Sequence, residues 1–176
     1  MKKRSLSFAE TNEARLVFGP GLDLEEVRVL ENAAGPLLVG RLAAALRQRP
    51  PPPAHAVTLG TTIYFSRALS IPREDETPRG FQDMAWLVHE LAHVWQYRHM
   101  GWRYLPKALE AFLRLGPLAY DYGGAPGLIT AGREGRRLAD FNPEQQGEIA
   151  RDYYLRLKAH LEVGPWERFV AELRSL

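Results

Sequence analysis

The sequence predicts an α+β domain that is mostly helical and has a small sheet packed on a central helix. Helix caps and helix-breaking Gly-Pro pairs divide most of the chain into segments of helical length. One run at 56–66, AVTLGTTIYFS, is instead rich in the β-branched and aromatic residues that strands favour. The 176 residues suit one domain, 1–176, with a core of its own.

The first half of the chain alternates helix and strand signals. Residues 5–18 place apolar side chains at helical spacing, and Gly19-Pro20-Gly21 ends that segment. Residues 26–30 alternate apolar and polar side chains as a strand does. Residues 37–49 favour a second helix, which the prolines at 50–53 must end because proline cannot continue a helix.

Helices dominate the second half. Periodic segments at 81–98 and 105–115 predict two of them. Residues 120–139 are rich in glycine and lack periodicity, so we expect a long loop there. A further helix begins at Asn142, a good N-cap that Pro143 follows, and runs to about Val163. A last helix is expected at 166–176.

Composition excludes several classes of protein. The net charge is +2, from 23 Lys and Arg against 21 Asp and Glu, and the cluster of Arg133, Arg136 and Arg137 lies among glycines, which favours a solvated loop over a nucleic-acid partner. Without cysteine there is no disulfide and no thiolate metal site. No segment approaches the roughly 18 apolar residues of a membrane span. The basic amino terminus lacks an apolar segment behind it, so we expect a cytoplasmic protein without a Sec signal, and export by a dedicated secretion system stays open.

The segment VHELAHVWQ at 88–96 carries three polar side chains through an apolar run. On a helix His89 and His93 lie one above the other, which is the spacing at which two imidazoles share a zinc ion. Glu90 lies on the flank of that face, where the H-E-x-x-H arrangement places a general base. Unpartnered, each of these groups would cost about 2–7 kcal/mol on burial. A zinc site is therefore favoured over two core histidines and a chance glutamate.

The third ligand is not His99. In the metzincin class a histidine stands at that position, but a glycine three residues earlier turns the chain back toward the metal. Here Gln96 takes the place of that glycine and favours continuing the helix, which leaves His99 on another face. The remaining source is a glutamate from the segment FNPEQQGEIARDYY at 141–154.

Two glutamates of that segment compete. In gluzincin-type sites an acidic residue often follows the ligand glutamate by four positions and orients a histidine, with a small residue before it. Glu144 fits this pattern, because Gly147 and Glu148 follow it. The alternative is Glu148 as the ligand with Asp152 orienting a histidine, although the residue before Asp152 is a bulky arginine.

Other side chains are candidates for contacts with a substrate. Gln96 lies one turn beyond His93 and either lines the cleft, where it would bind a substrate amide, or caps a buried backbone group. The TTIYFS strand is expected at the cleft edge, where an extended peptide could add as another strand and Tyr64 could contact it. Four tyrosines could supply a phenol to an oxyanion, or could simply pack in the core: Tyr120, Tyr122, Tyr153 and Tyr154.

Four segments in order, ETNEARLVFGPGLDLEEVRV, TTIYFS, LVHELAHVWQ and FNPEQQGEIARDYY, resemble a bacterial family of small zincin-like metallopeptidase domains. These are the core-type domains associated with extracellular contractile injection systems and with secretion-effector loci. The resemblance covers about residues 7–155 and implies a zincin-like fold, zinc on His89 and His93, a base role for Glu90, and a third ligand in the EQQGE segment. It also implies secretion-system components as partners.

The expected function is therefore zinc-dependent hydrolysis of a peptide bond in a protein or peptide substrate. The rival is a non-catalytic adaptor in which zinc only joins the helices and the domain docks on secretion machinery. A purely structural zinc site has no need of Glu90, and it would have four protein ligands where a catalytic site keeps one position open.

Overall fold

The structure is a computed structural model that describes residues 3–36, 56–71 and 78–175. Its helices are α1 (Phe8–Phe18), α3 (Pro78–Met100), α4 (Tyr104–Leu115), α5 (Gly124–Arg133), α6 (Pro143–Lys158) and α7 (Gly164–Arg174), with short 3-10 turns at Leu24–Glu26, Gly101–Arg103, Gly116–Tyr120 and Leu138–Asp140. Its strands are β1 (Lys3–Arg4), β2 (Arg28–Leu30), β3 (Ala56–Leu59) and β4 (Thr62–Phe65). The predicted α+β class, mostly helical with a small sheet, is confirmed. The helix predicted at 37–49 and the prolines after it lie outside the described residues.

The sheet has the strand order β1-β2-β4-β3. β2 and β4 are parallel, while β1 is antiparallel to β2 and β3 is antiparallel to β4. The run at 56–66 forms two strands, because Gly60, with φ of +63°, turns the chain back on itself. TTIYFS was expected at the cleft edge, where an extended peptide could add to it as another strand, but both sides of this strand are already paired. Its strand β4 is paired on both sides, with Tyr64 between Leu30 and Val57, and the edge strand next to it is β3.

The glycine-rich segment at 120–139, expected to be a loop, contains helix α5. Its glycines have specific structural roles. Gly123 and Gly124 have φ of +83° and +57° and turn the chain into the helix, and a Cβ on Gly127 would lie 2.3 Å from the carbonyl oxygen of Tyr122. Leu128 is buried in the core on one face of α5.

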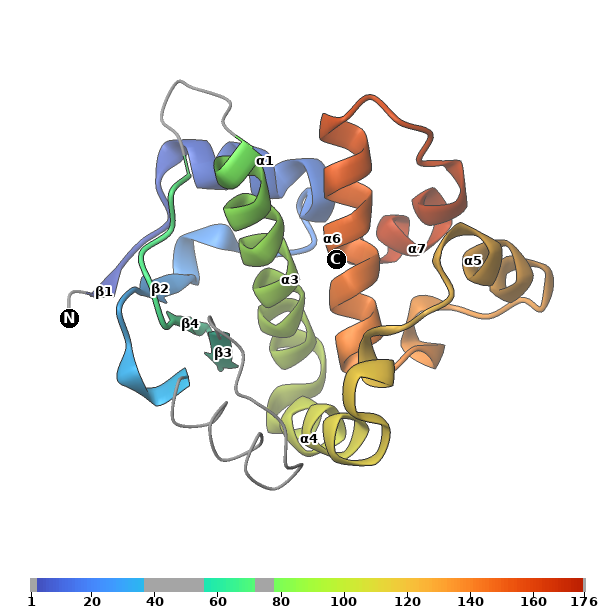
Figure 1. The fold of residues 1–176 in the computed structure, drawn as a ribbon, viewed down its shortest axis with the longest axis horizontal. Coiled ribbons are helices and arrows are strands. Elements are labelled where there is room, and N and C mark those ends of the chain that lie inside the picture. Colours follow the sequence, from blue (N-terminus) through green and yellow to red (C-terminus); the bar gives the residue numbers. More distant parts are fainter. Residues whose placement is uncertain (1–2, 37–55, 72–77, 176) are drawn as a thin grey trace.

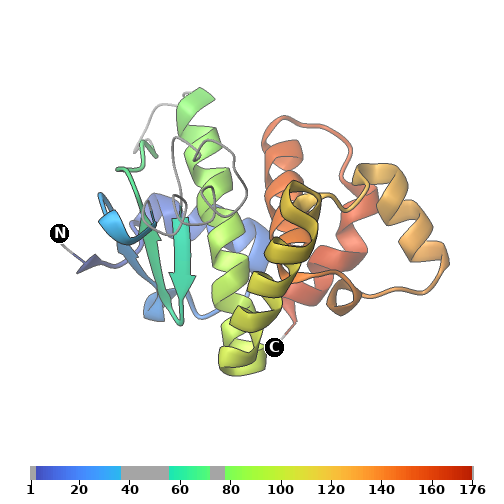
Figure 2. The same cartoon turned by 60° about the horizontal axis from the view of Figure 1, so that its bottom comes forward.

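Helix α3 lies at the centre of the molecule, with the sheet on one side and α6 on the other, and α1 crosses behind α3 toward α6 (Figures 1 and 2). It begins three residues earlier than predicted and ends at Gly101, whose φ is +60°. Its side chains Leu87, Leu91 and Val94 belong to the same buried core as Ile63 of β4. Among the described helices, none combines the length and the apolar content that crossing a membrane requires.

Candidate metal centre

Helix α3 turns His89 and His93 toward α6. Both side chains are buried, with residue exposures of 6% and 7%, and their ring centroids lie 5.0 Å apart. This is the geometry that four-residue spacing on a helix predicts. The polar face of α3 is therefore enclosed between two helices.

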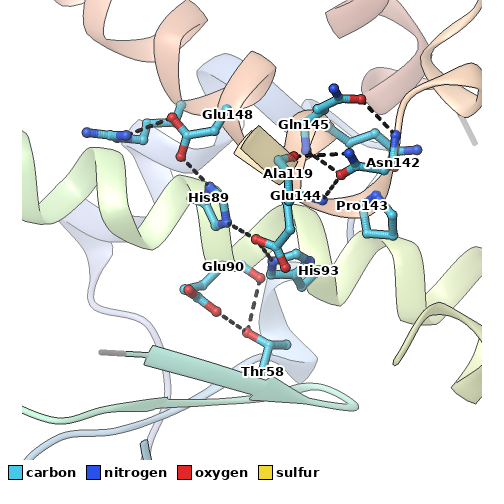
Figure 3. A network of polar contacts seen from close by, with 12 residues as sticks. Thr58, His89, Glu90, His93, Ala119, Asn142, Pro143, Glu144, Gln145 and Glu148 are labelled. Carbon is cyan, nitrogen blue, oxygen red and sulfur yellow. Dashed lines mark hydrogen bonds and ion pairs between the residues drawn. The ribbon is translucent and has the colours of Figure 1, made fainter. Parts of the chain in front are cut away.

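Helix α6 brings Glu144 to these histidines in its first turn (Figure 3). The Asn142 side chain caps the helix by accepting hydrogen bonds from the backbone N–H groups of Glu144 and Gln145, at 2.9 and 3.0 Å. The Gln145 side chain accepts from the backbone N–H of Asn142 at 3.1 Å and completes a capping box. The first turn, which would otherwise fray, is thus fixed where it carries the carboxylate.

Three side chains form a group that could hold a metal ion: His89, His93 and Glu144. One ligand atom from each lies within 4.8 Å of the others. Glu144 Oε2 is 3.4 Å from His89 Nε2 and 3.7 Å from His93 Nε2. Residues far apart in the sequence therefore present two imidazole nitrogens and one carboxylate oxygen to one point.

Glu148 stands behind His89, outside this group. Its Oε1 lies 3.0 Å from His89 Nδ1 and forms an ion pair with the protonated ring. Its Oε2 accepts a hydrogen bond from Arg151 at 2.7 Å. Asp152, the other carboxylate considered for orienting a histidine, instead accepts a hydrogen bond from Tyr122.

Gly147 is the point at which α6 contacts His89. A Cβ at this position would lie 2.7 to 2.9 Å from three atoms of the His89 ring, closer than carbon atoms normally approach. Only glycine leaves room for the imidazole, so the close approach of α6 to α3 depends on this residue.

The charged groups of the cluster shift one another's pKa values. Burial by itself lowers the pKa of His89, but the carboxylates of Glu144 and Glu148 outweigh it and raise the pKa to about 10. Burial also lowers the pKa of His93, and Glu144 again raises it above its usual value. Conversely, burial raises the pKa of Glu144, but the two imidazoles dominate and hold this pKa well below its usual range. The carboxylate is ionised, as a metal ligand must be.

Glu90 lies beside the cluster and is held from the sheet. The Thr58 hydroxyl on β3 donates to Glu90 Oε2 at 2.7 Å, and the Tyr104 hydroxyl donates to the Thr58 carbonyl at 2.6 Å. Burial raises the pKa of Tyr104 to about 12, so its hydroxyl stays a donor. Thr58 and Tyr104 were not identified from the sequence. The signal for Thr58 would have been a polar residue at an inward-facing position of a strand.

Gln96 has no exposed surface. Its side-chain oxygen lies 2.9 Å from His93 Nδ1, and its nitrogen donates to the carbonyl of Pro143 at 2.9 Å and to Gln146 Oε1 at 3.0 Å. The sequence left two roles open for Gln96: binding a substrate amide, or capping a buried backbone group. Its contact with the Pro143 carbonyl is of the second kind. Gln146 was not identified from the sequence.

Among the four tyrosines considered as donors to an oxyanion, Tyr120 lies beside the cluster. Its half-buried ring is tilted over His89, with the centroids 6.1 Å apart. Burial, with Glu144 and Glu90 nearby, raises its pKa, so the phenol stays protonated. The other three donate to carboxylates: Tyr122 to Asp152, Tyr153 to Glu167, and Tyr154 to Glu13.

A cavity of about 730 Å³ lies apart from the cluster, at the carboxyl end of α3. Trp95, His99 and Lys107 line it, together with Arg137, which pairs with Glu172 at 3.2 Å. None of the three side chains that could hold a metal is part of its lining.

Comparison with known proteins places this fold and site in context. A spike protein of the type VI secretion system of Pseudomonas aeruginosa, VgrG2b, is 31% identical over 98% of this chain, and the chain spans 15% of its length. A solved structure, the effector domain of Pseudomonas aeruginosa VgrG2b, has a TM-score of 0.55 and 23% identity, over 98% of this chain and 84% of that domain. The family model of the eCIS core domain matches residues 10–101, which include the H-E-x-x-H helix but not α6. Because this match covers more than half of the chain, the protein belongs to the eCIS core domain family.

Proposed function

We propose that this domain is a zinc-dependent hydrolase that cleaves peptide bonds, with His89, His93 and Glu144 as the metal ligands. The observation that carries the proposal is the buried group of two imidazoles and a carboxylate with Glu90 beside it. Three protein ligands of this kind are typical of catalytic zinc sites, which leave a fourth position open.

The donor distances fit zinc. Two ligands at about 2.0–2.1 Å from one zinc ion, at the tetrahedral angle, lie roughly 3.3–3.4 Å apart. Glu144 Oε2 lies 3.4 and 3.7 Å from the two histidine nitrogens, close to this spacing, and all three ligand atoms lie within 4.8 Å of one another. A zinc ion bound here would polarise a substrate carbonyl and lower the pKa of water to about 7.

Glu90 is the proposed general base. Thr58 donates to its Oε2, which fixes the carboxylate and leaves Oε1 as the oxygen to accept a proton. We propose that Glu90 takes the proton of the attacking water and passes it to the leaving amine. Tyr120, which lies over His89 and stays protonated, is the tyrosine best placed to donate to the developing oxyanion.

The proposed substrate is a protein or peptide in extended conformation. Among the residues that the structure describes, β3 pairs only with β4, and it carries Thr58, the residue that contacts Glu90. An extended peptide that added to β3 would therefore run beside the general base. The sequence led us to expect that the substrate would pair with β4, and we now propose that it pairs with β3.

The names of the similar proteins support a link with secretion. The relative is named as a spike of a secretion system, and the solved structure as its effector domain. We propose that secretion-system components are partners of this domain, and that such a system exports it from the cytoplasm.

A second candidate is a non-catalytic adaptor. The metal group joins α3 to α6, which is what a zinc ion that only joins helices would do. A purely structural metal site has no need of a general base such as Glu90, so the enzyme is the better proposal.

The test is the substitution Glu90→Gln. We expect this protein to bind zinc as the wild type does, and to lose about 10²–10⁴-fold in hydrolysis of a substrate found by proteome-wide cleavage profiling. Glu25→Gln, an exposed glutamate on another element, is the control and should stay active. A Glu90→Gln protein with full activity would refute the mechanism, and a wild type that binds zinc tightly but cleaves nothing would favour the adaptor.

A further inference from the structure

We infer that Gln96 is a positioning residue that sets the tautomer of His93 and, through the same amide, fixes the start of the helix that carries Glu144. The inference deepens the proposed function, because it rests on the metal site proposed above. It starts from a chain of buried amides that connects two backbone carbonyls to the His93 ring.

The two carbonyls fix the orientation of both amides, since a carbonyl oxygen can only accept a hydrogen bond. Phe141 O lies 2.8 Å from the side-chain nitrogen of Gln146, so the oxygen of that amide must face Gln96. Pro143 O lies 2.9 Å from the side-chain nitrogen of Gln96. The oxygen of the Gln96 amide must therefore face His93.

This orientation determines where the proton of His93 lies. The Gln96 oxygen is 2.9 Å from His93 Nδ1 and can only accept, so Nδ1 must carry a hydrogen and donate it. In the neutral imidazole the lone pair is then on Nε2, the atom that lies 3.7 Å from Glu144 Oε2. Gln96 thus selects the tautomer in which His93 can bind a metal alongside Glu144.

The two histidines are supported by different groups. Glu148 faces Nδ1 of His89, whereas a neutral amide faces Nδ1 of His93. An amide orients the second ring without adding another negative charge beside Glu90 and Glu144. Because Gln96 is fully buried, solvent cannot easily replace it.

The same amide also acts on the partner helix. Its nitrogen uses both hydrogens, one toward Pro143 and one toward Gln146, and these residues flank Glu144 in the sequence. One side chain of α3 therefore fixes both the ring of one ligand and the backbone next to another.

The test compares three variants by zinc titration against a competing chelator. Gln96→Met keeps the length of the side chain and loses the amide, and we expect it to bind zinc about 10- to 100-fold more weakly. Gln96→Glu keeps an oxygen for His93 and should recover part of that loss. Gln82→Met is the control, because Gln82 is an exposed glutamine near the start of the same helix α3 and has no part in the site. It should bind zinc as the wild type does.

A nitrogen-15 spectrum of the zinc-loaded protein provides a readout that does not depend on activity. We expect a His93 Nδ1–H that exchanges slowly with solvent in the wild type and in Gln82→Met, and quickly in Gln96→Met. The inference is overturned if Gln96→Met keeps both zinc affinity and the slow proton, or if Gln82→Met weakens zinc binding as much. A wild type that does not bind zinc would instead refute the metal site itself.

Discussion

At the scale of single residues, three glutamates of similar chemistry occupy three different environments. Glu90 receives a hydrogen bond from the sheet, Glu144 lies between two imidazoles, and Glu148 lies between His89 and Arg151. Glu144 and Glu148 are four residues apart and share the face of α6 that meets α3, whereas Glu90 lies on α3 itself. The roles proposed for them therefore differ even though the side chains are the same.

Removing each carboxylate of α6 in turn tests the ligand assignment. Glu144→Ala leaves two histidine ligands and should abolish tight zinc binding. Glu148→Ala removes only the group behind His89 and should cost about 10- to 100-fold in affinity. Zinc titration of both proteins decides between them, and a normal Glu144→Ala beside a non-binding Glu148→Ala would reverse the assignment and leave the class of enzyme standing.

The sequence was sufficient for the part of this site that depends on local spacing. The helix period predicts that His89 and His93 share a face with Glu90 on its flank, and Gly147 and Glu148 favour Glu144 as the third ligand, with Glu148 left open as the alternative. The partners of these residues could not be predicted in the same way. Thr58 reaches Glu90 only because a hairpin places β3 beside α3, and sequence patterns do not report such long-range contacts.

At the scale of helices and strands, the site depends on how closely α6 approaches α3, and Gly147 sets that distance. In Gly147→Ala the added carbon would stand 2.7 to 2.9 Å from the His89 ring, so either the ring or the helix must move. We expect much weaker zinc binding with little change in far-ultraviolet circular dichroism.

Gly132→Ala is the matched control for this substitution. It also places an alanine in a helix, and the nearest side-chain atom, at 3.2 Å, is the flexible end of Arg168. This protein should bind zinc normally. Equal zinc affinity in the two alanine variants would show that the approach of α6 does not depend on Gly147.

A buried ion pair joins the segment after β4 to α3. Asp83, with 1% of its surface exposed, accepts hydrogen bonds from Arg67 at 2.8 Å and from the backbone of Ser70 at 2.6 Å. Burial alone would raise the pKa of Asp83, but the hydrogen bonds from Arg67 and Ser70, together with the charges of Arg67 and Arg79, outweigh it and lower this pKa. The pair therefore contributes stability that is complete above the unfolded pKa of about 3.9 and is lost as the pH falls through the lower folded value.

Asp83→Asn should consequently be less stable at pH 7 by on the order of 1–3 kcal/mol. The difference from the wild type should shrink as the pH is lowered below about 4, because protonation then removes the same charge from the wild type. Urea unfolding of both proteins between pH 7 and pH 3 measures this. A difference that stays constant with pH would mean that the carboxylate charge contributes nothing.

Glycine explains the largest difference between the expected and the observed elements. The segment at 120–139 was expected to be a loop because glycine lowers helix propensity. In the structure Gly123 and Gly124 turn the chain, and Gly127 permits a close contact with the backbone of Tyr122. Some of the glycines in this segment are therefore compatible with a helix. Composition alone does not distinguish these uses of glycine.

At the scale of the whole molecule, the metal group lies where the side with the sheet and α3 meets the side with α6 and α7, and α1 crosses behind both sides (Figure 1). Other contacts also cross between the sides. The Tyr154 hydroxyl donates to Glu13 at 2.8 Å, and Arg174 donates to the carbonyl of Leu16 at 2.8 Å. The two sides also share one buried apolar core. The fold therefore does not depend on the metal alone.

Zinc should thus stabilise a protein that is already folded, unlike small zinc domains that unfold without metal. Free zinc at 100 times its Kd adds about 2.7 kcal/mol, which for a chain of this size raises Tm by roughly 5–10 °C. Thermal unfolding with a chelator and with added zinc measures this shift, and Glu144→Ala should show none of it. A chelated wild type without cooperative unfolding would mean that the metal holds the two sides together, and would strengthen the case for the adaptor.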